Sequence, residues 1–274
     1  MLFRSDAGKT VVITIKETGL QQIGTHFQKF ENWTAFKRLC STADGAIATT
    51  FDTEPLYRAA NPKLPLIFLP PPYPVEEWDI SSPEKSGIFI GTRQLFVTSR
   101  NHALALALVN PIAAELNEPI TVISGRASDL PPMKRVLNKV VDYSHDWHRQ
   151  FAETAPQLRV ISKQMPALDY LHTMASHRLV FQLDQSSVPG QVAGDALLCR
   201  IPCVGGNGTA ERIIFPGLCG HGRSTGELLD LTKRLLTDDS WFKETMTTAL
   251  KQALEKMSFM VAQRELRTFL TCAR

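Results

Sequence analysis

Short apolar runs of strand length alternate along this chain with longer segments that have the apolar spacing of helices. Many of the runs end at glycine, proline or polar residues, as buried parallel strands do. Strands that alternate with helices favour parallel pairing through right-handed crossovers. The pattern therefore predicts an α/β protein with a doubly wound parallel sheet. The expected strands cover residues 10–15, 46–49, 64–69, 87–90, 120–124, 158–161, 179–183 and 201–204.

The segments between these runs predict helices. The longest covers residues 241–270, is capped by Asp239 and is expected to break near Ser258. The other helices are expected over residues 25–40, 53–60, 99–116, 131–146, 165–176, 195–199 and 225–237.

A proline-rich segment interrupts the alternation. Residues 70–74 read Pro-Pro-Pro-Tyr-Pro, and proline fixes φ and lacks an N–H donor, so neither a helix nor a strand continues there. We expect an extended linker over residues 70–86. The chain is thereby predicted to divide into a small N-terminal α/β unit with the linker (1–80), a larger α/β domain (81–240) and a helical segment (241–274).

Composition narrows the class of protein. The 274 residues are 43% apolar and 21% charged, which is normal for a globular chain with an ample core. The net charge of +3 is small and interspersed, so nucleic acid is not indicated as a partner. No apolar run reaches the length of a membrane span, and the N-terminus lacks the apolar segment of a signal peptide. Five cysteines without a C-x-x-C pair predict a reduced, cytoplasmic protein without a metal site.

Residues 177–211 carry the most informative pattern, which is a strand, a polar turn, a short helix, a second strand and a glycine-rich loop. Both polar segments follow strands, and ligands of open α/β sheets bind at the carboxyl ends of the strands. A helix N-terminus at that edge directs backbone N–H groups at an anion. This stretch is therefore the candidate ligand site.

The stretch resembles the sugar-nucleotide motif of retaining GT-B glycosyltransferases of the group 1 family, P-S-x-x-E-G-F-G-x-x-x-x-E-A-M-A-x-G-x-P-V-V followed by a G-G-x-x-E turn. Residues 187–190 fall on E-G-F-G, residues 195–196 on the second E-A, and residues 201–204 on x-P-V-V. Weaker similarity extends over most of residues 9–271. The resemblance implies a GT-B-like fold with a Rossmann-like, nucleotide-sugar-binding second domain and a final helix that packs back on the N-terminal unit.

The chain also departs from the family. Ser187 stands where the family has its first glutamate, Asp195 replaces the second, and Arg200 replaces a small glycine. Lys16 stands where the family often has a histidine near the donor sugar. The N-terminal Rossmann-like unit is expected to be reduced, because few residues precede the linker.

The resemblance assigns the diphosphate of the donor to two arginines. Arg93 and Arg100 fall on the arginine of the family's G-R and the lysine of its K-N, in the loop that begins at Gly91. An arginine fork fits two phosphate oxygens and stabilises the charge that grows on a leaving diphosphate. A pair of solvated surface arginines is the alternative. Gly125, after another strand, is a candidate contact to the base or the pyrophosphate.

The remaining candidates lie in the stretch itself. Gly190 falls where the family presents a backbone N–H to the sugar or β-phosphate, and an ordinary turn glycine is the alternative. Asp195 falls on the acid that holds the ribose hydroxyls, and a helix-start aspartate is the alternative. Ser187 falls beside the donor sugar, where Asp184 is the nearest acid that could act catalytically instead, with a turn cap as the alternative. A backbone nest around the diphosphate is expected from Gly206, Asn207, Thr209 and Glu211.

We therefore expect a glycosyltransferase that moves a sugar from a nucleoside diphosphate sugar to an unknown acceptor hydroxyl, with retention and without a metal or other cofactor. A second chain that supplies the missing N-terminal domain is a candidate partner. A non-catalytic relative that binds a nucleotide or a partner chain is the first alternative, and Ser187 and Lys16 favour it. A nucleotide-sugar epimerase, which shares the architecture, is the second alternative.

Overall fold

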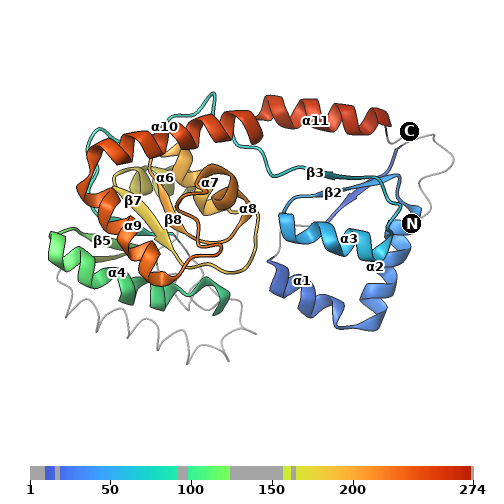
Figure 1. Cartoon of the computed structure of the whole chain (residues 1–274), viewed down its shortest axis with the longest axis horizontal. Helices are drawn as coiled ribbons and strands as arrows, with labels where there is room; N and C mark the ends of the chain where they lie inside the picture. The colour runs from blue at the N-terminus through green and yellow to red at the C-terminus, as the bar shows by residue number, and fades with distance from the viewer. Residues whose placement is uncertain (1–9, 16–18, 92–97, 124–156, 162–164, 273–274) are drawn as a thin grey trace.

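The computed structural model describes residues 10–15, 19–91, 98–123, 157–161 and 165–272. These residues form two separate parallel sheets with helices packed around each, and residues 69–87 connect the two sheets (Figure 1). The predicted α/β class and the parallel, doubly wound arrangement are confirmed. The domain boundaries predicted from the sequence, after residues 80 and 240, stay a prediction.

The first sheet is small. Its strands are β1 (Val12–Thr14), β2 (Gly45–Ala48) and β3 (Leu66–Phe68), in the order β1-β2-β3. The surrounding elements are α1 (Leu20–Phe27), α2 (Phe30–Thr42), the 3-10 turn η1 (Phe51–Thr53) and α3 (Glu54–Ala60). The buried apolar side chains between sheet and helices are Phe36, Cys40, Ala46, Ala48, Tyr57 and Leu64. We call residues 10–68 the first unit.

The second sheet has five strands. They are β4 (Ile88–Ile90), β5 (Ile120–Ile123), β6 (Leu158–Ile161), β7 (Leu179–Gln182) and β8 (Cys203–Gly205), in the order β6-β5-β4-β7-β8. The chain proceeds outward from β4 to β6 and then returns to the other side of β4 for β7. The strand order therefore reverses between β4 and β7, and open sheets bind ligands at such a point, beyond the carboxyl ends of the strands.

Helices cover both faces of the five-stranded sheet (Figure 1). One pair that contacts the sheet is α4 (His102–Leu116) and α9 (Thr225–Thr237), and the other side carries α6 (Ala167–Ala175) and α7 (Gln191–Leu198). Short strands such as β4 are buried along their whole length because both faces are covered.

The proline-rich connection is fixed against the second sheet's helices. Tyr73 N donates to Met257 O at 2.8 Å, and Tyr73 Oη donates to Gln191 O at 3.2 Å. The ring of Tyr73 lies over Gly194 of α7, where an added Cβ would be 1.9 Å from the ring. Tyr73 of the Pro-Pro-Pro-Tyr-Pro run therefore anchors the extended segment to α7 and to the end of α10.

The last two helices pass from one sheet to the other (Figure 1). Helix α10 (Asp239–Lys256) packs against α9 and against α8 (Thr209–Ile214) beside the larger sheet, and α11 (Phe259–Cys272) continues toward the smaller sheet. The ring of Phe269 lies against Gly45 of β2, where an added Cβ would be 2.6 Å away. The break that the sequence predicts near Ser258 is confirmed.

Several predicted helix ends were wrong. The helix expected over residues 25–40 is two helices, α1 and α2, and α7 begins at Gln191 rather than at residue 195. Asp238, not Asp239, caps α10, because its carboxylate accepts from Trp241 N at 2.9 Å. The short helix α8 (Thr209–Ile214) follows directly on glycines that the sequence pattern assigns to a loop. The helix expected over residues 131–146 lies outside the described residues.

Candidate functional site

The candidate site lies at the carboxyl ends of β4, β7 and β8, where the strand order reverses. Gly91 directly follows β4 and is buried between strand and helix, since an added Cβ would be 2.6 Å from Val192 and 2.7 Å from Val180. A glycine at this place allows α7 to approach the sheet closely.

An ion pair holds the end of β7 against the 3-10 turn η2 (Thr98–Arg100), which precedes α4. Arg100 Nη1 donates to Asp184 Oδ2, and the two side chains are only 22% and 4% exposed. Asp184 Oδ1 accepts from Ser186 N at 2.8 Å and from the Ser186 hydroxyl. Asn101, at φ 48°, adds a bond from Nδ2 to Leu183 O at 3.0 Å. The structure thus brings two of the predicted residues, Arg100 and Asp184, into direct contact.

Two loops meet at this edge of the sheet, loop 184–190 after β7 and loop 205–208 after β8. Asn207 N donates to Asp184 O at 3.0 Å, and Asn207 Oδ1 accepts from Ser187 N at 3.0 Å. Ser187 adopts a left-handed φ of 49°, and its hydroxyl accepts from Asn207 Nδ2 at 3.4 Å. Asn207 therefore determines the conformation of the loop that carries Ser187.

The first turn of α8 lies under loop 184–190. Thr209 N donates to Val188 O and Ala210 N donates to Pro189 O, both at 2.9 Å. Thr209 itself is 2% exposed, so it faces the protein interior. These two bonds hold loop 184–190 against the first turn of α8.

Glu211 is the most unusual residue of the site. It is 2% exposed, and its Oε1 accepts from Gln182 Nε2 at 2.7 Å. The pKa of Glu211 is raised to about 7, chiefly by burial and then by the charge of Asp184, whereas its own backbone N–H, the bond from Gln182 and the charge of Arg100 lower it. A buried carboxyl with such a pKa is typical of functional sites.

Two other candidates are enclosed by protein to different degrees. Gly190 is buried at the N-terminus of α7 with φ 90°. Asp195 lies one turn further along α7 and is half-buried near Cys199, whose thiol pKa is raised to about 12 by burial and secondarily by Asp195. The predicted contacts of Gly190 and Asp195 with a donor stay predictions.

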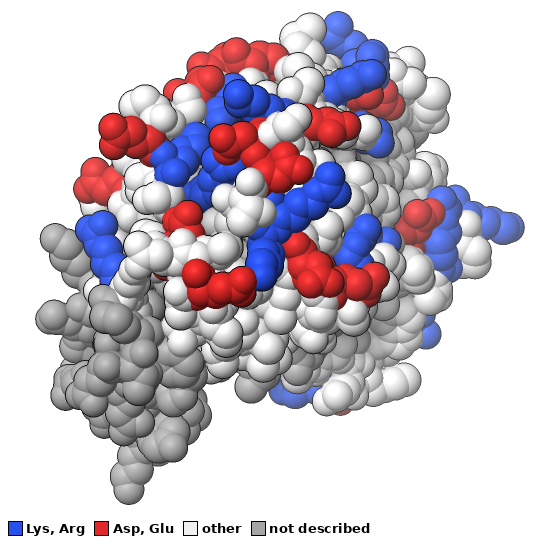
Figure 2. Space-filling model, turned by 60° about the vertical axis from the view of Figure 1, so that its left-hand side comes forward, with Lys and Arg blue, Asp and Glu red and all other residues white. Residues whose placement is uncertain are grey.

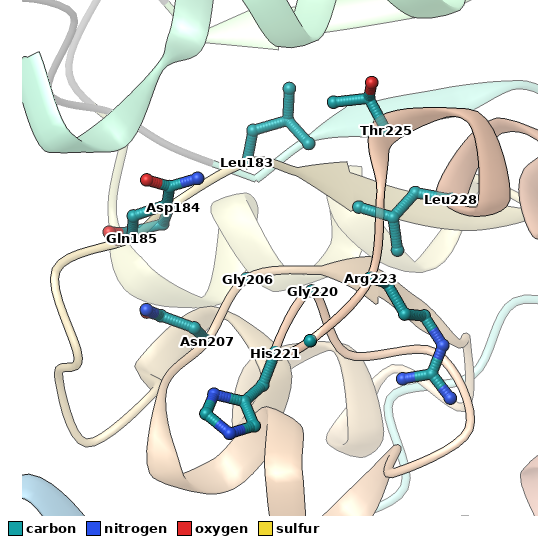
Figure 3. Close-up of a pocket in the computed structure, with 11 residues that line it drawn as sticks. Leu183, Asp184, Gln185, Gly206, Asn207, Gly220, His221, Arg223, Thr225 and Leu228 are labelled. Atoms are coloured by element: carbon teal, nitrogen blue, oxygen red, sulfur yellow. The ribbon is translucent and has the colours of Figure 1, made fainter.

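A cavity of about 160 Å³ opens beside these loops (Figure 3). Asp184, Gly206 and Asn207 line it, as expected for the predicted site. Its lining also includes His221 and Arg223 from the segment before α9, and the sequence gives no signal that these two belong to the donor site. Arg223 supports that segment, because its Nη1 donates to Cys219 O at 3.0 Å and to Pro216 O at 3.2 Å.

The first unit reaches the rim of the site. Leu20 N, at the start of α1, donates to Ser186 O at 2.8 Å, and an added Cβ at Gly19 would be 2.7 Å from Ser186. On α8, the guanidinium of Arg212 lies 3.5 Å from Asp52 Oδ2 and 4.4 Å from the centre of the Phe51 ring. The loop that carries Asp184 and Ser187 is therefore bounded by both sheets.

The predicted donor contacts Arg93 and Gly125 lie outside the described residues, as does Lys16. Within the described ranges, no group of three or more His, Cys, Asp or Glu side chains is arranged to hold a metal ion. Every helix in these ranges is too short or too polar to traverse a lipid bilayer. Positive and negative side chains are interspersed over the face in Figure 2, as the charge pattern of the sequence predicts.

No family model and no curated protein sequence matches this chain. Solved structures match it over almost its whole length. A sucrose-phosphate synthase from Thermosynechococcus elongatus has a TM-score of 0.63 at 14% identity, covering 96% of this chain and 68% of its own. A UDP-forming α,α-trehalose-phosphate synthase from Burkholderia xenovorans has a TM-score of 0.71 at 10% identity, with 96% and 68% covered.

A third similar structure, described as trehalose-6-phosphate from E. coli bound with UDP-2-fluoro glucose, has a TM-score of 0.71 at 10% identity, with 97% and 68% covered. At these identities the similarity establishes the fold alone. The chain has a GT-B-like fold.

Proposed function

We propose that this protein is a glycosyltransferase that moves a sugar from a nucleoside diphosphate sugar to an acceptor hydroxyl. The observation that carries the proposal is a polar site at the strand-order reversal of a GT-B-like sheet, where Arg100 and the backbone of loop 184–190 converge. The bound UDP-2-fluoro glucose in one structure of similar fold supports the class of donor.

Arg100 is proposed to stabilise the leaving diphosphate. Its guanidinium is oriented by Asp184 through Nη1, and its side chain is 22% exposed at the strand end. A guanidinium can donate from five N–H groups, so pairing with one carboxylate oxygen leaves donors for a phosphate. Charge stabilisation on the leaving group is the largest electrostatic requirement of such a transfer.

The sugar is proposed to lie beside Ser187, whose neutral hydroxyl replaces the carboxylate of the resembling family. Asp184 is the nearest carboxylate and lines the cavity, but the guanidinium of Arg100 and the Ser186 amide occupy its oxygens. We propose that Asp184 adds its negative charge to the cavity while it stays paired with Arg100. Retention of configuration and the absence of a metal requirement belong to this proposal, as implied by the resemblance.

A donor screen tests the proposal. Thermal unfolding is followed with UDP-, GDP-, ADP- and TDP-glucose and with the free diphosphates, because a ligand of the folded state raises apparent stability by mass action. The expected result is a rise in unfolding temperature with one base only, followed by slow transfer or hydrolysis of that radiolabelled sugar without added metal. The absence of a shift with every nucleotide would contradict donor binding.

A further inference from the structure

The carboxyl of Glu211 is enclosed by the protein. Oε1 accepts from Gln182, while Oε2 is buried and has no hydrogen-bond partner among the residues that the structure describes. A buried polar atom of this kind costs free energy, so its retention calls for a role.

Three glycines surround this carboxyl. An added Cβ at Gly190 would be 2.1 Å from Glu211 Oε2, and one at Gly208 would be 2.4 Å from the same atom. At Gly206 the added Cβ would be 3.1 Å from Glu211 Cγ. The sequence predicts ligand contacts for Gly190 and Gly206. In the structure, the missing side chains of all three glycines make room for Glu211.

We propose that Glu211 is a positioning residue. Its carboxyl holds loop 184–190 from the protein interior in the conformation that binds the donor, and it does not itself touch the donor. This inference rests on the proposed function for the identity of the donor. The carboxyl lies against Gly190 at the end of the loop, and the amides of Thr209 and Ala210 hold Val188 and Pro189 from the same short helix. Glu211 thereby joins β7, loop 184–190 and loop 205–208.

The charges around Glu211 make this contact dependent on pH. Asp184 at the end of β7 and Arg100 before α4 act on it with opposite sign, and Cys203 of β8 faces it as a neutral thiol, since burial raises the Cys203 pKa well above its usual value. Because the pKa of Glu211 is about 7, ionisation above neutral pH places a buried negative charge beside Gly190. Opening of loop 184–190 then admits water to that charge.

Hydrogen exchange of loop 184–190 in the free, full-length protein tests the proposal. Exchange at pH 6 to 8.5, corrected for intrinsic rates, is compared in wild type, Glu211→Gln, Glu211→Ala and the control Glu244→Gln, an exposed acid of α10. Glutamine keeps the size and mimics the neutral acid, so its loop should stay protected at every pH. Wild type and the control should lose about tenfold protection between pH 6 and 8.5, and Glu211→Ala should be exposed throughout.

Two outcomes would overturn the proposal. One is wild-type protection that follows the same pH curve as Glu211→Gln, and the other is a folded Glu211→Ala variant as protected as wild type. Thermal unfolding of each variant shows whether it is folded. Should Glu211→Ala not fold, the comparison of wild type with Glu211→Gln alone tests the proposal. UDP, GDP, ADP and TDP are added in a separate arm. Failure of all four to bind, with the loop result intact, contradicts the proposed function and leaves the structural role of Glu211 standing.

Discussion

The two sheets of this protein differ in the polar groups that they bury. Around the three-stranded sheet the buried hydroxyls of the described residues are those of Thr50 and Thr53, which bond to each other, and that of Tyr57, which accepts from Ile15 N at 2.6 Å. Around the five-stranded sheet the buried polar side chains include the carboxyls of Asp184, which follows β7, and of Glu211 in α8. Burial of a hydroxyl bonded to its neighbour costs little, whereas burial of a carboxyl costs several kcal/mol unless it is paired. The contrast supports the placement of the proposed site on the larger sheet.

Replacement of a glycine by alanine should show the largest difference in the free energy of unfolding between the two units. Gly190→Ala places a Cβ 2.1 Å from Glu211 Oε2 at φ 90°, so we expect a loss of about 3 kcal/mol or more in the free energy of unfolding. Gly24→Ala, in α1, meets no atom within 4 Å and should change stability by less than about 1 kcal/mol, in the stabilising direction. Urea unfolding measures both. Similar losses at the two positions would show that Gly190 is not constrained.

The pH dependence of stability should come from the larger sheet. The pKa of Glu211 is about 7 in the folded protein against its ordinary value of 4.5, so the folded state binds the proton more tightly. Its contribution is therefore complete below pH 4.5 and is lost as pH rises to about 7, a decrease of about 3 kcal/mol.

Urea unfolding at several pH values checks this dependence. Glu211→Gln should remove the decrease, and Glu54→Gln, on exposed α3 of the first unit, should leave it unchanged. A wild-type pH profile that Glu211→Gln does not alter would assign the dependence to another group.

Nucleotide affinity should distinguish two arginines. Arg100→Ala should weaken binding of the nucleoside diphosphate found in the donor screen by roughly 1.5–3 kcal/mol, the scale of a hydrogen bond to a charged group. Arg58→Ala, in the first unit, should not change it, because Arg58 pairs with Glu54 in a half-exposed position. Calorimetry gives the affinities, and unfolding curves show that each variant is folded. Unchanged affinity in folded Arg100→Ala would remove Arg100 from the phosphate site.

The contact between the units should have the smallest effect. A double-mutant cycle of Arg212→Ala and Asp52→Ala should give a coupling of about 0.5–1 kcal/mol, because both side chains are partly buried. The same cycle on Arg58 and Glu54, both about half exposed, should give about 0.3 kcal/mol. A coupling near zero for Arg212 and Asp52 would show that this contact does not join the units.

Regular structure could be predicted from the sequence where the apolar pattern decides it. The apolar runs that form β4, β5, β6 and β7 are bounded by polar residues or glycine. Burial of such short apolar runs in a covered sheet requires that they form strands. Helix ends were less predictable, because α7 starts at a left-handed Gly190 whose conformation depends on packing. Residue type alone does not reveal that packing.

Part of the candidate site could also be predicted. Arg100, Asp184, Ser187 and Asn207 do meet, since the carboxyl ends of parallel strands share one edge. The burial of Glu211 could not be predicted, because it depends on the absence of side chains at Gly190 and Gly208, which approach it only in the folded chain. His221 and Arg223 lie in a segment without a motif, so no pattern marked them.

The Tyr73 contact also has a mechanical consequence. The chain passes between the sheets twice, through residues 69–87 and through the break between α10 and α11, and the two passages meet where Tyr73 pairs with Ser258 and bonds to Met257. These contacts join the two passages to each other, so a rotation of one unit relative to the other would strain both together. The same rotation would part Leu20 from Ser186 and Arg212 from Asp52.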